Sequence, residues 1–251
     1  MSALLELSNV NKHFGGLHAV RNVTFSVQPG EVVGILGPNG AGKTTLYNLL
    51  TGFIRPDVGA RIVFDGRDVV GMPPHSVAAL GISRTFQLCR PFVGMSVLEN
   101  VIVGGLGTQR RDGAALDERA RSLLVQVGLA GKEATPVEVL SYGDQRRLEI
   151  ARALAARPKL LLLDEPFAGL GSGEIADLSA LIRQVHAAEG LTVVLIEHKL
   201  REFMRLVDRV IALDFGEVIA QGLPEDIVRH PAVIEAYIGR DVPDTEAAHA
   251  A

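Results

Sequence analysis

One loop of the chain combines the residue types that hold phosphate groups. Residues 37–44 match the pattern G-x-x-x-x-G-K-[ST] and lie between an apolar run at 32–36 and a helix-like stretch at 45–50. Glycines let backbone N–H groups converge on phosphate oxygens, and the N-terminus of the following helix adds partial positive charge. We therefore expect a bound nucleoside triphosphate. The predicted nucleotide-binding residues of this loop are Gly37, Pro38, Asn39, Gly40, Ala41, Gly42, Lys43, Thr44 and Thr45.

Two side chains of the loop have distinct predicted roles. We expect Lys43 to reach the β and γ phosphates, and Thr44 to offer its hydroxyl to Mg²⁺, an ion that needs few protein ligands. The alternative is a glycine-rich turn that carries Lys-Thr by chance. A strand before the loop and a helix after it favour the nucleotide site.

Two acids end a second apolar run. Residues 160–163 are all leucine, which is typical of a parallel strand buried on both faces, and Asp164 and Glu165 follow directly. Parallel sheets bind ligands at the carboxyl ends of their strands. We expect Asp164 to position Mg²⁺ through water. Glu165 is expected to accept a proton from, or orient, the water that attacks the γ-phosphate. A strand that leaves the core through a polar turn is the alternative.

A second candidate anion site lies at the start of a helix predicted over residues 142–156. It combines the Ser141 hydroxyl, the Gly143 N–H and the helix N-terminus. Ser141 and Asp144 also fit a capping box, which would be a purely structural role. Two phosphate sites and a single phosphate-loop lysine in one chain require an explanation.

The bulk composition restricts the class of protein. The chain has 251 residues and is 47% hydrophobic, enough for one large α/β domain with a small subdomain. Its charge of −4 and its lack of tryptophan do not favour a nucleic-acid partner. Cys89 is the single cysteine, which excludes an internal disulfide and fits a reducing cytosol. No apolar run approaches the roughly 20 residues that span a bilayer, so any work at a membrane would need partners.

The pattern of predicted elements indicates how these residues are positioned. Strands are expected within residues 4–36, and strands at 160–163 and 192–196 flank a helix around 175–188, which predicts a largely parallel sheet. Helical segments and polar loops dominate the region after residue 88. We therefore predict one domain at 1–240 with a helical subdomain inserted at about 88–156, and a frayed tail at 241–251.

The segment at residues 140–145 resembles the signature motif of the ABC-transporter ATPases, and the resemblance extends over residues 4–239. It implies a P-loop NTPase of the ABC type: a mostly parallel core sheet, an N-terminal antiparallel β-subdomain and an inserted α-helical subdomain. In that family two ATPase subunits pack head to tail, and the signature of one closes on the γ-phosphate held by the other. This implies that Ser141 and Gly143 act in trans.

Three further residues match family positions. Gln87 resembles the Q-loop glutamine, which senses Mg²⁺ and water, and His198 resembles the switch histidine that contacts the γ-phosphate. Phe14 resembles the aromatic residue that stacks on adenine. The alternatives are an exposed polar side chain, a structural histidine and a packed phenylalanine.

Further features resemble the branched-chain amino-acid importer subgroup: Tyr142 in place of a glycine, and the segments at 48–53, 84–87 and 222–239. The resemblance implies an ATP-hydrolysing subunit at the cytoplasmic face of the plasma membrane. Its implied partners are a second ATPase in a homo- or heterodimer, membrane permeases received near residues 88–104, and indirectly an extracytoplasmic binding protein. Similar subunits serve urea and short-amide uptake, and a non-transport ABC ATPase is a further alternative.

The chain departs from the family pattern at three more positions. Asp144 replaces a usual glutamine of the signature. Gly171 occupies the D-loop position where Asp, or Asn in this subgroup, is usual, so this loop lacks the side chain for a cross-subunit contact. Lys199 follows His198 where an acid is common, and the sequence provides no account of it.

Overall fold

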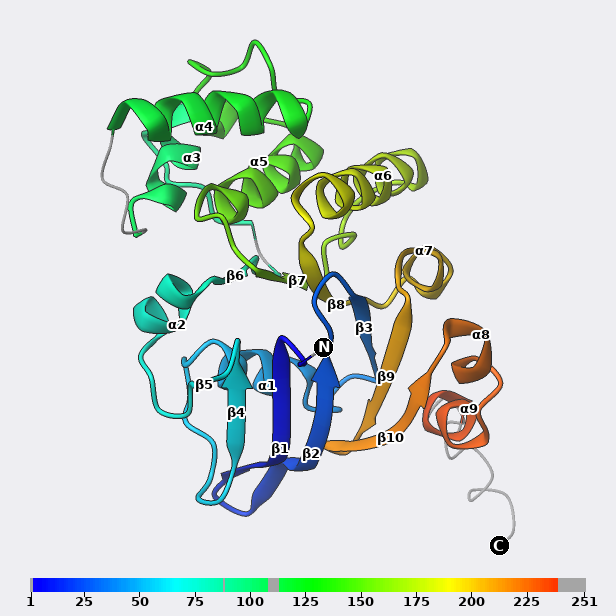
Figure 1. Cartoon of the computed structure of the whole chain (residues 1–251). Helices are drawn as coiled ribbons and strands as arrows, with labels where there is room; N and C mark the ends of the chain where they lie inside the picture. Colours follow the sequence, from blue (N-terminus) through cyan, green and yellow to red (C-terminus); the bar gives the residue numbers. More distant parts are fainter. Residues whose placement is uncertain (1, 88, 108–112, 239–251) are drawn as a thin grey trace, which may run out of the picture.

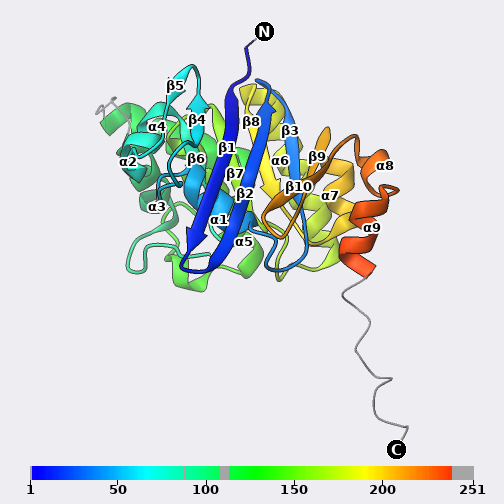
Figure 2. The same ribbon diagram turned by 90° about the horizontal axis from the view of Figure 1, so that it is seen from below.

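The computed structural model describes residues 2–87, 89–107 and 113–238, so the predicted tail at 241–251 lies outside the described residues. Two sheets and the surrounding helices make up the fold (Figure 1). Figure 2 shows β1 and β2 in front of α1, with α8 and α9 at the other end of the molecule from α2, α3 and α4.

The smaller sheet is antiparallel, with the order β2-β1-β4-β5. Apolar side chains of its long strands point into the core. In β1, Leu5 and Leu7 alternate with more exposed residues, and a shift in register after Leu7 leaves Val10 buried as well. Its strands are β1 (Leu5–Phe14), β2 (Leu17–Val27), β4 (Arg61–Phe64) and β5 (Arg67–Asp68).

The larger sheet has the order β10-β9-β3-β8-β7-β6, in which only the β9–β10 pair is antiparallel. All residues of β3, β7 and β8 are buried, as expected for central parallel strands. The carboxyl ends of these strands therefore meet at one edge. The strands are β3 (Val32–Leu36), β6 (Ile82–Arg84), β7 (Leu160–Asp164), β8 (Thr192–Ile196), β9 (Arg209–Asp214) and β10 (Glu217–Gly222).

Helices α3, α4 and α5 pack together at one end of the molecule (Figure 1, green), within the predicted helical subdomain, whose limits remain a prediction. None of the described helices is long and apolar enough to cross a membrane. The helices are α1 (Lys43–Leu50), α2 (Pro74–Leu80), α3 (Val97–Gly105), α4 (Gly113–Gln126), the 3₁₀ turn η1 (Val137–Val139), α5 (Tyr142–Ala155), α6 (Ser172–Glu189), α7 (Leu200–Leu206), α8 (Pro224–Ile227) and α9 (Pro231–Ile238).

Helix α6 begins at Ser172, a few residues before the predicted start near 175. The cause is local: the Glu174 carboxylate accepts the Gly171 N–H at 2.9 Å, which satisfies a backbone donor at the helix start.

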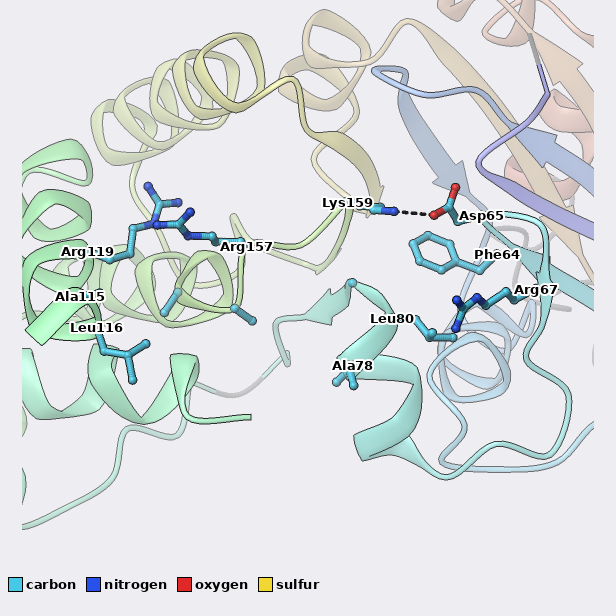
Figure 3. Close-up of a pocket in the computed structure, with 14 residues that line it drawn as sticks. Phe64, Asp65, Arg67, Ala78, Leu80, Ala115, Leu116, Arg119, Arg157 and Lys159 are labelled. Carbon is cyan, nitrogen blue, oxygen red and sulfur yellow. Dashed lines mark hydrogen bonds and ion pairs between the residues drawn. The ribbon is translucent and has the colours of Figure 1, made fainter. Parts of the chain in front are cut away.

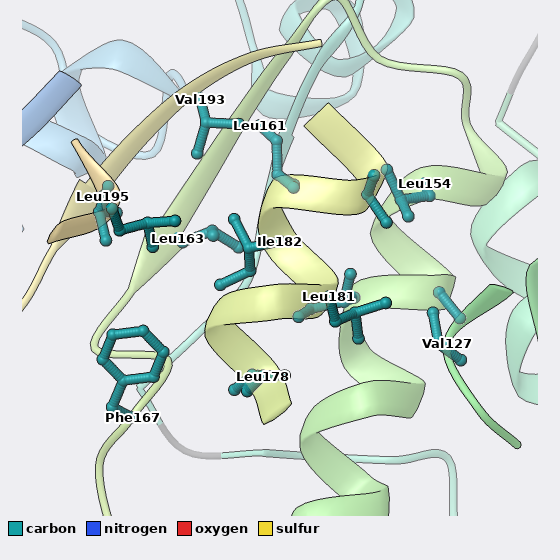
Figure 4. Packing of buried hydrophobic residues seen from close by; sticks show 14 of the residues in the cluster. Val127, Leu154, Leu161, Leu163, Phe167, Leu178, Leu181, Ile182, Val193 and Leu195 are labelled. Atoms are coloured by element: carbon teal, nitrogen blue, oxygen red, sulfur yellow. The ribbon is translucent and has the colours of Figure 1, made fainter. Parts of the chain in front are cut away.

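The central sheet separates two apolar clusters. Alternate side chains of β7 and β8 point to opposite faces, because side chains alternate along a strand. Leu161, Leu163, Val193 and Leu195 join the cluster that includes α5 and α6, where they pack near Ile182 (Figure 4). The other face of the same strands contributes to the cluster with α1 and the antiparallel sheet. Both faces of the strands that carry the predicted acids are therefore rigidly packed.

Candidate functional site

The phosphate loop connects β3 to α1 and depends on glycine at two positions. A Cβ at Gly37 would lie 2.3 Å from the Leu213 carbonyl oxygen. Gly42, at the N-cap of α1, has a φ of 98°, and a Cβ there would lie 2.5 Å from the Ala19 carbonyl oxygen. Any side chain would therefore clash with backbone. Because α1 begins at Lys43, the N-terminus of this helix lies at the end of the phosphate loop.

Lys43 is buried inside this loop. Its Nζ donates to the carbonyl oxygens of Gly37 at 2.6 Å and Pro38 at 3.0 Å. Burial lowers the pKa of Lys43, while the nearby carboxylates of Glu165 and Asp164 act in the opposite direction. The ammonium thus lies near both predicted acids. Phosphate oxygens accept stronger, charge-assisted hydrogen bonds than these carbonyls do.

Asp164 ends β7 in a buried ion pair. Arg84, at the end of the neighbouring strand β6, places Nη2 2.7 Å from Asp164 Oδ2 and donates from Nη1 to Asn48 Oδ1 at 2.7 Å. Thr85 supports the same strand end, since its Oγ1 accepts the Asp164 N–H at 3.2 Å. Sequence reasoning missed the role of Arg84. The available signal was a cation at a strand end directly before the Q-loop segment.

Glu165, Gln87 and His198 converge although they come from three segments. Gln87 Nε2 donates to Glu165 Oε2 at 2.9 Å, and His198 Nε2 lies 2.7 Å from Glu165 Oε1. Glu165 has a φ of 48°, a conformation that non-glycine residues seldom adopt and that often occurs at functional sites. The carboxylate is held between the Gln87 amide and the His198 imidazole. Such a group can orient a water molecule or accept its proton.

The predicted Mg²⁺ ligands share one cleft of about 880 Å³, which Thr44, Gln87 and Asp164 help to line. A hydroxyl, an amide oxygen and a carboxylate are hard oxygen donors, which suits Mg²⁺. Within residues 2–87, 89–107 and 113–238, no group of three or more His, Cys, Asp or Glu side chains could hold a metal. The three oxygen donors at the cleft fit an ion whose shell is completed by phosphate and water.

Ser141 and Gly143 line a separate cavity of about 180 Å³, together with Arg147 and Glu174. Ser141 Oγ also accepts the Asp144 N–H at 3.2 Å, so the capping role is present. The large cleft beside the phosphate loop is lined by other residues. The fold thus brings Lys43, Asp164 and Glu165 together but places the signature residues elsewhere.

Phe14 ends β1 with 47% of its surface exposed, and Lys12 Nζ lies 5.3 Å from its ring centroid. An aromatic face this open can stack on a planar ligand, and the lysine would add a favourable cation.

A buried ion pair joins the signature helix α5 to the Q-loop, which sequence reasoning did not foresee. Arg146 donates to the carbonyl oxygens of Phe86 at 3.2 Å and Gln87 at 2.7 Å, and to the Tyr142 hydroxyl at 2.7 Å. Its Nη1 lies 3.3 Å from Glu149, whose other oxygen accepts the Phe86 N–H at 2.9 Å. The backbone that carries Gln87 is therefore anchored on the helix that carries Ser141.

A further cavity of about 490 Å³ lies between α2, α4 and the β4–β5 hairpin, beside the ion pair of Lys159 and Asp65 (Figure 3). None of the predicted site residues lines it in the described part of the chain. The cavity is therefore not the candidate site.

Known protein families and individual relatives are similar to most of this chain. The model of the ABC transporter family matches residues 20–168, and that of the branched-chain amino acid ATP-binding cassette transporter matches residues 217–243. The high-affinity branched-chain amino acid transport ATP-binding protein BraF of Pseudomonas aeruginosa is 41% identical over 250 residues, covering 94% of this chain and 98% of BraF.

Two solved structures are similar to the whole fold. The ADP conformation of MJ1267, an ATP-binding cassette of an ABC transporter, superposes with a TM-score of 0.86 at 32% identity, covering 95% of this chain and 100% of MJ1267. A dimeric post-hydrolysis state of the cassette MJ0796, bound to ADP and Pi, has a TM-score of 0.77 at 27% identity and covers 88% of this chain and 98% of MJ0796.

These comparisons confirm the resemblance drawn from residues 140–145, the predicted P-loop fold and the ATPase class. The family model covers more than half of the chain, and BraF is similar over nearly all of it. The chain therefore belongs to the ABC transporter family, as one of its ATP-binding cassettes.

Proposed function

We propose that the chain is the ATP-binding and ATP-hydrolysing subunit of an importer for branched-chain or other hydrophobic amino acids. The observation that carries the hydrolytic role is the position of Glu165, held by Gln87 and His198 beside the buried ammonium of Lys43. The similarity to BraF, and the match of residues 217–243 to the branched-chain cassette model, support the substrate class. An importer of urea or short amides is the second candidate.

In this mechanism the residues of the chain divide the work on ATP. The phosphate loop and Lys43 bind the β and γ phosphates, and Phe14 stacks on adenine. Thr44, Gln87 and Asp164 would hold Mg²⁺, which when bound neutralises charge on the phosphate oxygens. Glu165 orients the attacking water and receives its proton, while His198 contacts the γ-phosphate.

The proposed active site is completed by a second ATPase subunit. Ser141 and Gly143 face a small cavity of their own rather than the large cleft beside the phosphate loop. In a head-to-tail pair they would meet the γ-phosphate bound by the partner. The dimeric structure of the MJ0796 cassette supports the presence of a second ATPase subunit.

A permease is the proposed partner of exposed aromatic side chains beside Gln87, which line the same cleft as the predicted Mg²⁺ ligands. Phe53, Phe86 and Phe92 line this cleft and are about half exposed, and the rings of Phe53 and Phe86 lie 6.1 Å apart, edge to face. Exposed aromatic side chains around a cleft are typical of protein interfaces. A permease segment bound there would contact the residues beside Gln87, so transport and hydrolysis would be coupled. The subunit would then lie at the cytoplasmic face of the membrane, with an extracytoplasmic binding protein delivering the solute.

The substitution Glu165→Gln tests the hydrolytic proposal. It keeps the shape of the side chain but removes the base, so we expect kcat for ATP hydrolysis to fall by about a hundredfold or more while ATP binding remains. Steady-state hydrolysis and equilibrium nucleotide binding measure the two properties. Glu225→Gln, on the exposed start of α8, is the matched control and should leave both unchanged.

The same variant tests the substrate class in cells that contain the natural permeases. Uptake of labelled leucine should stop in the Glu165→Gln strain, and urea uptake should be unaffected. A Glu165→Gln protein that hydrolyses ATP at the wild-type rate contradicts the assignment of the base. Loss of urea uptake with normal leucine uptake favours the second candidate.

A further inference from the structure

Two positions at which the chain departs from the family pattern lie close together in the structure. Gly171 leaves the D-loop position without a side chain, and Lys199 stands where an acid is common. In the structure Lys199 Nζ donates to the carbonyl oxygen of Leu170 at 2.9 Å. Leu170 directly precedes Gly171, so the lysine binds the same loop from the segment that carries His198.

Glu197 connects the same two segments from the other side of His198. Its side chain is 2% exposed, and its carboxylate accepts three backbone N–H groups. Oε1 accepts from Phe167 at 2.7 Å, and Oε2 accepts from His198 at 2.7 Å and Lys199 at 3.0 Å. A buried carboxylate with three such donors is well satisfied and fixes the backbone around it.

Both contacts lie next to the proposed hydrolysis residues. The turn after Glu165 is closed by the Ala168 N–H, which donates to the Glu165 carbonyl oxygen at 3.1 Å, and by the Leu170 N–H, which donates to the Phe167 carbonyl oxygen at 3.2 Å. Glu197 and Lys199 hold this turn against the segment that carries His198. The separation of 2.7 Å between His198 Nε2 and Glu165 Oε1 depends on how these two segments are placed.

We propose that Glu197 and Lys199 are positioning residues that hold the turn at Phe167–Leu170 against the switch segment, the residues that follow β8 and carry His198. The inference rests on the proposed function, because its readout is ATP hydrolysis. Without the Lys199 donor, the Leu170 carbonyl loses its hydrogen bond to the switch segment. Glu165 and His198 would then spend less time in the hydrolytic arrangement, while the phosphate loop would still bind ATP.

The test compares variants of the full chain in steady-state ATP hydrolysis. Lys199→Met keeps most of the apolar stem and removes the donor; we expect kcat to fall about tenfold, the loss typical of one charge-assisted hydrogen bond, with KM for ATP within about twofold. Lys199→Arg should restore most of kcat. Lys159→Met, at an exposed ion pair away from the site, is the control.

Several results would contradict the positioning role of Lys199. A Lys199→Met protein with wild-type kcat, or a loss that Lys199→Arg does not restore, overturns it. A rise in KM that accounts for the whole effect also overturns it. If Lys199→Met does not fold by circular dichroism, Lys199→Gln, whose amide is too short to reach Leu170, must show the same loss and the same rescue. A wild-type chain that does not hydrolyse ATP contradicts the proposed function instead.

Discussion

Cys89 shows how the surroundings of one residue determine its chemistry. Its Sγ–H donates to the Gln145 carbonyl oxygen at 3.1 Å and lies 3.5 Å from Glu149 Oε2. Burial raises the pKa of the thiol to about 12, and the adjacent Glu149 carboxylate acts in the same direction. Because the thiolate is the nucleophile, a thiol that stays protonated is inert. The surroundings of Cys89 therefore favour a packing role over a nucleophilic one.

Alkylation measures this effect directly. At pH 8 the raised pKa of Cys89 lowers the thiolate fraction about a thousandfold relative to the unfolded chain. We therefore expect iodoacetamide to label the native protein that much more slowly than the same protein in urea, as followed by mass spectrometry. Cys89→Ser reports any labelling at other residues. Equal rates in the native and unfolded proteins would show that the thiol is accessible and ionised.

Helix α5 links two parts of the proposed mechanism. Arg146 and Glu149 lie one turn apart on this helix, with side chains 2% and 4% exposed, and both bind the backbone of the Q-loop. A movement of the signature end of α5 would therefore be transmitted to Gln87 through hydrogen bonds rather than through flexible loops. The pair is buried, so each charge depends on the other for solvation.

A double-mutant cycle tests this dependence. Arg146→Met leaves the Glu149 carboxylate without its cation, and Glu149→Gln leaves the Arg146 guanidinium without its anion. Each single substitution should lower the free energy of unfolding by about 3–5 kcal/mol. The double variant should be more stable than the sum of the two losses predicts. Urea denaturation followed by circular dichroism measures all four proteins. Additive losses would mean that the two side chains do not stabilise one another.

At the scale of the whole molecule, the proposed site is divided between two chains. Lys43 lies near Glu165 and Asp164, whereas Ser141 and Gly143 line a cavity of their own with Glu174. The fold of a single chain therefore keeps these two sets of residues in separate cavities. A head-to-tail dimer would join one set from each subunit and would make hydrolysis depend on closure of the pair.

Mixing two inactive variants tests this division. Lys43→Ala removes the phosphate contact, and Ser141→Ala removes the signature hydroxyl, so each homodimer should be inactive. A mixed dimer contains one site with both residues intact, and we expect ATP hydrolysis to reappear when the two proteins are combined. The colourimetric release of phosphate measures this recovery. Mixtures that stay inactive, although cross-linking shows mixed dimers, contradict completion in trans.

Much of the fold and site could be predicted because the signals are local. The turns of the phosphate loop require glycine at Gly37 and Gly42. The four consecutive leucines before Asp164 indicate a strand that is buried on both faces, and β7 is such a strand. The capping box at the start of α3 likewise needs only Ser96 and, three residues later, Glu99. In each case, residues close together in the sequence are sufficient to form the local structure.

The sequence by itself determined the nucleotide-binding loop, the two acids and the family, because each depends on a short run of adjacent residues. Only the tertiary structure decided which distant side chains meet. Arg84 reaches Asp164 because β6 and β7 are parallel neighbours. Arg146 reaches Gln87, and Lys199 reaches Leu170, across segments far apart in the chain. Such contacts depend on strand register and helix packing, which no local pattern of residues specifies.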